Sequence, residues 1–403
     1  MKKTLAWLSM TVVLLLGLGI VLLATASTVR AQIEYHGDPL GYFKRQLMWL
    51  AIAFVAGLAA TKFDYHRWQK FPYMTIAFYA GVFILLAAVI CPGLRREING
   101  SYRWLILGPL RLQPSELGKL ATVIVMSVWM DRIGWRVEQF KKGALIPAVG
   151  LAAYLGLVLA ETDFGATVVM AVVGGALMFV AGVRWRYLIG MGLFGVLGVG
   201  AMVVRNANRM ARIKGWFGHM FPDVEWFQVS AGVNIDPAVL EHAAQKAKAA
   251  AYQLDQALIA FKNSGFWGVG LNQSVQKFEY LPESHTDFIF AIGGEEMGFI
   301  FSVGVVLLFL SLLICGMVIS FKAPDRLGRL MAFGMTLLLI FQVFFNIGVV
   351  TGVFPTKGIA LPFMSYGGSN MLTALIAVGT LFNIGIQCET ASGKMAKNVV
   401  SRV

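Results

Sequence analysis

Residues 5–26 read LAWLSMTVVLLLGLGIVLLATA, a run of 22 positions without a charged side chain that follows Lys2 and Lys3. A cleaved signal peptide has an apolar stretch of only about 7–15 residues. A helix that spans the hydrocarbon core of a bilayer needs about 20 residues. The run therefore predicts an uncleaved membrane-spanning helix, and similar runs recur along the chain as far as Ile386.

The composition of the chain agrees with this interpretation. Of 403 residues, 58% are hydrophobic and 14% are charged, whereas a soluble domain carries about 25% charged residues. This balance excludes a soluble enzyme, a disordered protein and a nucleic-acid-binding domain with a membrane tail. Cys91, Cys315 and Cys388 lie in or beside apolar runs and show neither a disulfide framework nor a metal-ligand spacing.

Ten apolar runs predict an all-α, polytopic fold: one membrane domain of ten transmembrane helices that covers residues 1–403. The runs are residues 5–26, 46–61, 71–91, 114–130, 144–159, 165–182, 187–204, 288–319, 330–353 and 368–386. The run from Phe288 is long enough to be tilted or kinked. The 44 glycines suit a closely packed bundle, because small residues let helix backbones approach each other in lipid.

The distribution of Lys and Arg predicts the orientation of the spans. With the N-terminus inside, the short inner segments carry 17 of these residues and the short outer segments carry 8. Because short inner loops are enriched in positive charge, both termini are expected inside the cell.

The segment 205–287 is the one long loop, and this orientation places it outside the membrane. Residues 237–262 within it are predicted to form a helix, with Asp236 as N-cap and Pro237 at the first helical position. Its weak apolar stripe indicates a helix that lies on the outer membrane surface or covers the bundle. A partner-docking element is the alternative.

Several ionisable residues lie in the spans or at their ends, where each charge costs about 2.5–3.5 kcal/mol and needs a partner or a task. They are Glu116, Lys119, Asp163, Asp287, Glu295 and Glu296. Glu116 and Lys119 are three positions apart, so they share a helix face and can form an ion pair.

Four cations and two carboxylates border one outer site in this topology. They are Arg45, Arg103, Arg111, Lys119, Asp163 and Asp287. A cluster of Arg and Lys suits a phosphate or diphosphate, and a substrate that reaches it from the bilayer would be a lipid-linked phosphate. The simpler alternative is a mixture of helix caps and cations that reach the interface.

Asp287 has two roles open to it in this cluster. It is placed as an N-cap of the eighth span, and it is also placed to remove a proton from a substrate; the two roles do not exclude each other. Oxygen-only ligands favour Mg²⁺ or Mn²⁺, so a divalent cation held by Asp287 or Asp163 together with substrate phosphates is expected.

The stretch Ser365-Tyr366-Gly367-Gly368-Ser369 follows two prolines, Pro355 and Pro362, and indicates irregular backbone. At membrane depth such backbone survives only where it lines a cavity or is buried in protein. A tight turn between the ninth and tenth spans is the alternative. His285 is interpreted as a hydrogen-bonding neighbour of the Asp287 turn, since His285 and His36 are not spaced as a pair of metal ligands.

Four motifs in these regions resemble the SEDS (shape, elongation, division, sporulation) family. They are RWL at 103–105, LQPSE at 112–116, LPESHTDFIFA at 281–291 and SYGGS at 365–369. They occur in the family's order and spread over nearly the whole chain. Three further stretches, RMARI at 209–213, GLNQSVQK at 270–277 and PTKG at 355–358, are closer to the division branch than to the elongation branch.

The resemblance implies a peptidoglycan glycosyltransferase that polymerises lipid II at the outer face of the bacterial inner membrane, at the division septum. Implied partners are a class B penicillin-binding protein, which is the division transpeptidase, and other division proteins; no nucleic acid is implied. It implies Asp287 as the essential aspartate. Residues implied for substrate binding are Arg45, Arg103, Arg111, Lys119, Gln253, Gln256, Ser365, Gly367 and Gly368, with Asp163, Glu116, His285, Glu295 and Glu296 as supporting groups.

The chain departs from the family pattern in its long loop. Residues 260–265 read AFKNSG where the family has a glycine-rich step, and a stretch within about 215–262, mainly 215–250, looks inserted. Both departures concern the loop's partner contacts and leave the Asp287 motif intact.

The implied chemistry is an attack by the 4-hydroxyl of the acceptor's terminal GlcNAc on the anomeric carbon of a lipid-diphosphate MurNAc donor. Asp287 takes the proton or orients the hydroxyl, undecaprenyl diphosphate leaves, and the cations hold its charge. Inversion is expected because no second carboxylate is placed as a nucleophile. The alternatives are a lipid II flippase, for which Glu295, Glu296 and Lys119 would form a polar path, and a non-catalytic division scaffold.

Overall fold

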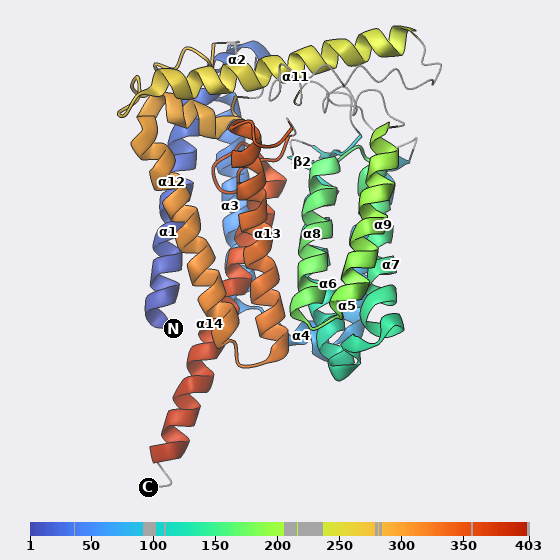
Figure 1. Ribbon diagram of the computed structural model, residues 1–403. Helices are drawn as coiled ribbons and strands as arrows, with labels where there is room; N and C mark the ends of the chain where they lie inside the picture. Colours follow the sequence, from blue (N-terminus) through green and yellow to red (C-terminus); the bar gives the residue numbers. More distant parts are fainter. Residues whose placement is uncertain are drawn as a thin grey trace.

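The computed structural model describes residues 1–35, 37–91, 102–108, 110–204, 216, 237–278, 281, 284–355 and 358–400. Figure 1 shows an upright bundle of helices with both chain termini at one end and the helix α11 (Pro237–Ser264) lying across the other. These are called the terminal end and the α11 end below.

The protein is an all-helical polytopic membrane protein. The other helices are α1 (Lys2–Ala26), α2 (Thr28–Glu34), α3 (Gly41–Lys62), α4 (His66–Lys70), α5 (Pro72–Ile90), α6 (Pro114–Ile133), the 3-10 helix η1 (Gly134–Glu138), the π-helix η2 (Phe140–Leu145), α7 (Ile146–Ala160), α8 (Phe164–Val180), α9 (Trp185–Val204), α12 (Ile289–Lys322), α13 (Arg326–Val350) and α14 (Gly368–Val400).

A helix coincides with each of the ten apolar runs predicted from the sequence. Among the described residues, seven helices are long and apolar enough to cross a membrane: α1, α3, α5, the continuous η2–α7 helix, α12, α13 and α14. The helices at the other three runs, α6, α8 and α9, stand beside them in Figure 1.

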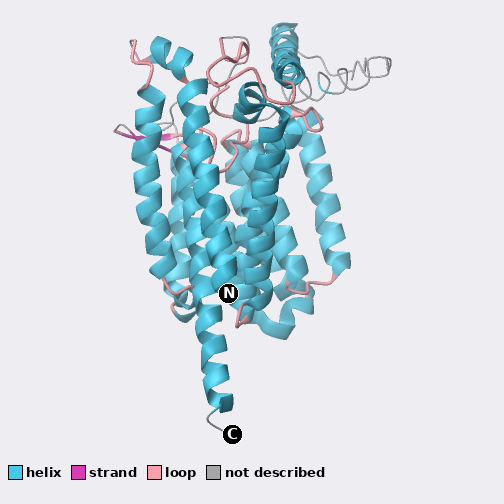
Figure 2. Cartoon of the chain, turned by 90° about the vertical axis from the view of Figure 1, so that its left-hand side faces the viewer, coloured by secondary structure: helices cyan, strands magenta, loops and turns pink. Residues whose placement is uncertain are grey.

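A small hairpin departs from the predicted all-α class. Strand β1 (Leu105–Leu107) pairs antiparallel with β2 (Leu110–Leu112), with Ile106 opposite Arg111. Gly108 has a φ of +60° in the connecting turn, a conformation that glycine adopts without steric cost. Figure 2 shows the hairpin at the edge of the bundle toward the α11 end. Hydropathy alone missed it because its three-residue strands are too short to give an alternating pattern.

The bundle is held by close contacts between helix backbones. An added Cβ at Gly57 of α3 would lie 2.9 Å from the Leu375 carbonyl oxygen of α14, and one at Gly379 would collide with the Gly57 carbonyl. These positions confirm the expectation that small residues bring helices together in lipid. The three cysteines are free, as predicted.

Helix α12 is broken at Gly298, as the length of the run from Phe288 predicted. Gly298 has φ +78° and ψ −171°, and an added Cβ there would collide with the backbone of Gly268. The short piece from Ile289 up to the break is buried in the protein. The irregular backbone is tolerated because another part of the chain covers it.

Helix α11 confirms the predicted helix in the long loop and begins at Pro237; the predicted cap, Asp236, lies outside the described residues. Its second half packs on the bundle through Leu254, Ala257 and Ala260, which are all buried. The helix therefore covers the bundle, which is one of the two placements expected for it (Figure 1).

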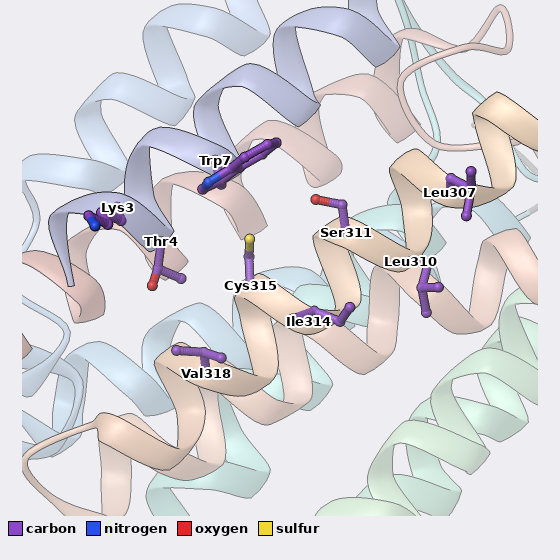
Figure 3. A pocket seen from close by; sticks show the side chains of 9 residues that line it. All are labelled: Lys3, Thr4, Trp7, Leu307, Leu310, Ser311, Ile314, Cys315 and Val318. Atoms are coloured by element: carbon purple, nitrogen blue, oxygen red, sulfur yellow. The ribbon is translucent and has the colours of Figure 1, made fainter.

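A groove of about 450 Å³ opens between α1 and α12 toward the terminal end (Figure 3). It is lined by Lys3, Thr4, Trp7, Leu307, Leu310, Ser311, Ile314, Cys315 and Val318. The lining contains one cation and no acid, and it lies far along both helices from Asp287. This groove is therefore a feature of the surface between two helices and not the site expected from the sequence.

We expect Gly379→Ala to lower the melting temperature of the purified protein, since overpacking a close helix contact costs about 1–3 kcal/mol. Thermal unfolding followed by circular dichroism in detergent measures this. The matched control is Gly175→Ala in α8, where nothing lies within 4 Å of an added Cβ. Equal melting temperatures for the two variants would contradict the close approach of α3 and α14.

Candidate active site

Four segments meet at the α11 end of the bundle: the turn 284–288 before α12, the start of α6, the turn 161–163 before α8, and the irregular stretch 358–367 before α14. Each begins or ends a helix of the bundle. Side chains from distant parts of the sequence are thereby brought to one place.

Asp287 lies in the turn that leads into α12. The N-cap of α12 is Phe288 and no side chain caps the helix, so the prediction of Asp287 as N-cap is wrong by one residue. The Asn346 amide donates to the Asp287 carbonyl oxygen at 2.8 Å and to the Ile359 carbonyl oxygen at 2.7 Å. The Asp287 carboxylate packs against Gly358, where a side chain would collide with it. Asn346 therefore ties the aspartate's turn to the stretch before α14.

Asp163 caps α8 and joins it to α6. One carboxylate oxygen accepts from the Ala166 amide at 3.1 Å, and the other accepts from the Gln113 side chain at 2.6 Å and the Ser115 hydroxyl at 3.0 Å. An added Cβ on the neighbouring Gly165 would lie 2.7 Å from Ile359. The cap of α8 and the turn of Asp287 thus contact opposite sides of the same short stretch, Gly358–Ile359.

Lys119 and Glu116 form the ion pair that their spacing predicted. The ammonium lies 2.7 Å from the carboxylate, and the two side chains are only 3% and 9% exposed. Lys119 also donates to the Gln342 side chain at 2.8 Å. Gln342 lies one turn before Asn346 on α13, so this buried pair is linked to the turn of Asp287 through a single helix.

Arg45 and Arg111 both lie near Tyr366. Arg45 sits 4.7 Å from the centre of the Tyr35 ring, and Arg111 is an exposed residue of strand β2. Burial raises the pKa of Tyr366 to about 12, and Tyr35 acts in the same direction, while the positive charges of Arg45 and Arg111 act against the rise. The Tyr366 amide donates to the His285 carbonyl oxygen at 2.9 Å. Two predicted cations are therefore grouped beside the turn that carries Asp287.

His285 is buried beside the rings of Tyr42 and Tyr366, with ring centres 4.5 and 5.8 Å away. Its backbone is hydrogen-bonded to the stretch before α14. This agrees with the interpretation of His285 as a hydrogen-bonded neighbour of the turn.

The SYGGS stretch fastens the turn of Asp287, and its backbone is irregular and buried as expected. The Ser365 hydroxyl donates to the Thr286 carbonyl oxygen and accepts from the Leu361 amide at 2.8 Å. The Gly367 amide donates to the Gln46 side chain at 3.3 Å, and Gly368 packs on the face of the Trp49 ring. Ser365, Gly367 and Gly368 hold the site together through backbone contacts.

Glu161 belongs to this region and was missed from the sequence. It is fully buried, and neither carboxylate oxygen has a hydrogen-bond partner among the described residues. Burial raises the pKa of Glu161 to about 9; the negative charge of Asp163 adds to the rise and Arg103 opposes it. Glu161 follows directly after an apolar run, where a charged residue ordinarily marks the end of a span. Its position in the sequence therefore did not indicate a buried site residue.

Two amides on α13 were also missed, namely Asn346 and Gln342. Both are buried, and both bind site residues directly. A usable signal was present, since an amide inside an apolar span usually donates to a neighbouring helix.

Several polar atoms around the site lack hydrogen-bond partners in the described part of the chain. They include Nε of Arg103, Oε2 of Glu116, Oδ1 of Asn346 and the carboxylate of Glu161. Buried polar atoms of folded proteins are almost always satisfied by protein, water or ligand. Their concentration here indicates a place for a polar ligand.

Four of the predicted residues are not tied to this cluster. Glu295 and Glu296 are buried but bind the loop 272–277, on the far side of the short piece of α12. Gln253 and Gln256 are half-buried on α11, and no hydrogen bond within the described residues joins either to the Asp287 turn.

The carboxylates give limited support for a divalent cation. Within the described residues, no group of three or more His, Cys, Asp or Glu side chains is placed to hold a metal ion. Mg²⁺ commonly binds through one or two carboxylates and substrate phosphates, keeping several waters. The donors present suit a cation that arrives with a phosphorylated substrate.

The comparisons with known proteins agree with the family resemblance of the motifs. The family model FTSW_RODA_SPOVE, described as cell cycle protein, matches residues 6–389. Relatives named "Probable peptidoglycan glycosyltransferase FtsW" in Geobacter sp. (strain M18) and Coxiella burnetii are 36% and 35% identical. Each alignment covers 95% of this chain, with 97% and 96% of the respective relative.

Two solved structures share the fold. One comes from a peptidoglycan synthase complex that coordinates polymerization and crosslinking, with a TM-score of 0.67, 24% identity and coverage of 94% of this chain and 97% of that one. The other is the rod shape determining protein RodA of Thermus thermophilus, with a TM-score of 0.63, 24% identity and coverage of 94% and 95%. These likenesses establish the fold alone.

We expect Glu161→Gln to stabilise the protein in a pH-dependent way. The folded chain keeps the Glu161 proton up to about pH 9, whereas the unfolded chain releases it near 4.5, so the parent loses stability as pH rises through this window. Each pH unit within this window lowers the free energy of unfolding by about 1.4 kcal/mol. Melting temperatures at pH 5 and pH 8 measure the effect.

The stabilisation by Glu161→Gln should be larger at pH 8 than at pH 5. The control is Glu138→Gln, which removes an exposed carboxylate paired with Arg184 and should show no such trend. The same melting difference at both pH values would show that Glu161 is not held protonated.

Proposed function

The chain belongs to the FtsW/RodA/SpoVE family of cell cycle proteins, and we propose that it polymerises lipid II as a peptidoglycan glycosyltransferase. Relatives that match almost its full length carry that activity in their names, which agrees with the activity predicted from the motifs.

The observation that carries the proposal is the attachment of the Asp287 turn to the stretch that includes Tyr366, the residue near which Arg45 and Arg111 lie. The Asp287 turn is fastened by three backbone carbonyls, those of His285, Thr286 and Asp287, while the Asp287 side chain stays outside the α12 cap. A carboxylate fixed through its backbone can approach a substrate hydroxyl with little loss of entropy. In the proposed reaction Asp287 takes the proton of the acceptor's 4-hydroxyl, or orients that hydroxyl, for attack on the anomeric carbon of the donor.

The diphosphate leaving group would be held by the neighbouring cations. Arg45, Arg103 and Arg111 carry delocalised charge and several donors, which suits phosphate oxygens. Lys119 has its ammonium in the pair with Glu116, so its proposed part is to fix α6 and α13 around the diphosphate. No second carboxylate is proposed as a nucleophile, so one displacement with inversion is expected.

A divalent cation would be shared between the substrate diphosphate and one carboxylate, Asp287 or Asp163. Such an ion would supply positive charge for the departing diphosphate. Asp163 accepts hydrogen bonds from Ala166, Gln113 and Ser115, so a cation bound there would share its carboxylate with the cap of α8.

The proposed topology has ten spans, with α6, α8 and α9 added to the seven helices of sufficient length and hydropathy. The excess of Lys and Arg at the terminal end supports the proposal that both termini lie in the cytoplasm. Asp287 would then face outward. Location in the inner membrane, at the division septum, is proposed, with support from the cell cycle family to which the chain belongs.

The proposed partner is a class B penicillin-binding protein that crosslinks the strands. Support comes from the shared fold with a chain of a synthase complex that couples polymerization to crosslinking. The departures at residues 260–265 lie where α11 ends, so the contact with such a partner is expected to differ in this loop.

The arrangement of buried charges argues against a flippase path. Glu296 is paired with Lys277 at 3.1 Å, and Lys119 is paired with Glu116 at 2.7 Å. A path for a lipid headgroup needs polar groups that are available along its length, whereas these groups bind each other. A purely scaffolding role predicts that changes at Arg103, Lys119 and Asp287 are silent.

We expect Asp287→Asn to lower polymerisation by about 10²-fold or more, because the amide cannot accept the hydroxyl proton. Glycan strands made from purified lipid II by the chain with its crosslinking partner are separated on gels to measure this. The matched control is Asp38→Asn, an acid of the loop before α3 that binds Lys44. Strand synthesis at the parental rate by Asp287→Asn would remove this residue from the mechanism.

Removal of divalent cations with EDTA is expected to stop polymerisation, and Mg²⁺ or Mn²⁺ is expected to restore it. The diphosphate and a single carboxylate supply the ligands, so binding of the cation should depend on lipid II. Full activity in EDTA, with the cation content checked by mass spectrometry, would show that Arg and Lys alone neutralise the leaving group.

A further inference from the structure

The break in α12 is filled by a returning piece of the long loop. At the break the carbonyls of Glu295 and Glu296 lose their helical partners and instead accept from the amides of Val269 and Gly270, at 2.9 and 3.0 Å. Gly268 lies against the Glu296 carbonyl with no room for a side chain. The loop therefore docks on α12 with backbone hydrogen bonds that compensate the helix break.

A buried ion pair lies beside these backbone bonds. The Lys277 ammonium is 3.1 Å from the Glu296 carboxylate, and the two side chains are 1% and 0% exposed. Lys277 also donates to the Asn272 side chain at 2.6 Å, and the Thr25 hydroxyl of α1 donates to Glu296 at 2.8 Å. The pair thus joins three elements: α1, the long loop and α12.

Glu295 completes this arrangement from the next position. It accepts from the Ser274 hydroxyl and from the amides of Val275 and Gln276, at 3.2 and 3.4 Å. We call the set Thr25, Asn272, Ser274, Lys277, Glu295 and Glu296 the loop clamp. Both α12 carboxylates that the sequence analysis noted at membrane depth are therefore engaged by the loop.

The loop clamp holds both sides of the segment that carries Asp287. Lys277 lies ten residues before Asp287 and Glu296 lies nine residues after it. Their pairing joins the two ends of a stretch that contains the turn 284–288. Three carbonyls of that turn are bound by α13 and the stretch before α14, and the clamp adds an attachment through α12 and α1.

We propose that Lys277 and Glu296 are positioning residues for Asp287. They act by fixing the loop against α12, and they do not contact the substrate. This role rests on the proposed glycosyl transfer for its catalytic consequence, whereas the positioning itself concerns the turn alone. The positioning role also explains why the Lys277–Glu296 pair, which is costly to desolvate, lies at the break of α12.

The test uses Lys277→Met, Glu296→Gln and the exchanged double variant Lys277→Glu/Glu296→Lys in the full chain with its crosslinking partner. Initial rates over a series of lipid II concentrations separate kcat from KM. We expect each single variant to lower kcat by about tenfold or more with KM within about twofold, since a misplacement of about 1 Å costs up to 10²-fold in rate. The exchanged variant should recover part of kcat.

A second readout follows the turn directly and does not depend on activity. Amide hydrogen exchange of residues 284–288 should accelerate by about tenfold or more in Lys277→Met, while exchange in α6 stays unchanged. The matched control is Lys322→Met, an exposed residue in the last turn of α12 at the terminal end, without a hydrogen bond or ion pair in the described part of the chain. It should alter neither readout.

The outcomes separate the two claims. Unchanged exchange at 284–288 in Lys277→Met, or parental kcat in both single variants of an active enzyme, would overturn the positioning role. A parent chain that makes no glycan, with exchange at 284–288 still accelerated in Lys277→Met, would refute the proposed function alone. If Lys277→Met does not fold, Thr25→Val removes only the bond from α1, and unchanged exchange and kcat there would overturn the inference.

Discussion

The site depends on one constraint: backbone groups at the end of a membrane bundle must be satisfied by the protein itself. The Asn346 side chain meets this constraint by donating to the carbonyls of both Asp287 and Ile359. It thereby fixes the turn before α12 against the stretch before α14, which in turn contacts the cap of α8. The same satisfaction of buried carbonyls that membrane folding requires also fixes the turn that carries Asp287.

The buried ionisable side chains of this molecule are of two kinds, those in ion pairs and those without a hydrogen-bond partner among the described residues. In the pairs Lys119–Glu116 and Lys277–Glu296 each carboxylate binds an ammonium. Lys119 also donates to the Gln342 side chain, and Glu296 also accepts from the Thr25 hydroxyl. Glu161, in contrast, has no hydrogen-bond partner in the described residues, and burial raises its pKa. Paired charges hold helices and loop in place, whereas the unsatisfied groups lie near Arg103 and Asp163, where a polar ligand would complete them.

Hydropathy located every helix of the bundle, because a spanning helix needs a long run of apolar residues whatever its neighbours are. The Glu116–Lys119 pair and the break in α12 were also predictable, from spacing and from length. Hydropathy did not predict the roles of Asn346, Gln342 and Glu161, since each depends on which distant segment packs against it. The prediction of Asp287 as the N-cap of α12 was wrong by one residue. The N-cap is Phe288, which has no polar side chain that would mark it in the sequence.

The central claim is that Asp287 and the neighbouring arginines form one pocket for a lipid-linked diphosphate at the α11 end. A cryo-electron microscopy structure of the chain with bound lipid II tests this most directly. We predict diphosphate density within hydrogen-bonding reach of Arg103, Arg45 or Arg111, with the sugar next to the Asp287 carboxylate. Density for the headgroup at the terminal end, or in the groove between α1 and α12, would contradict the account.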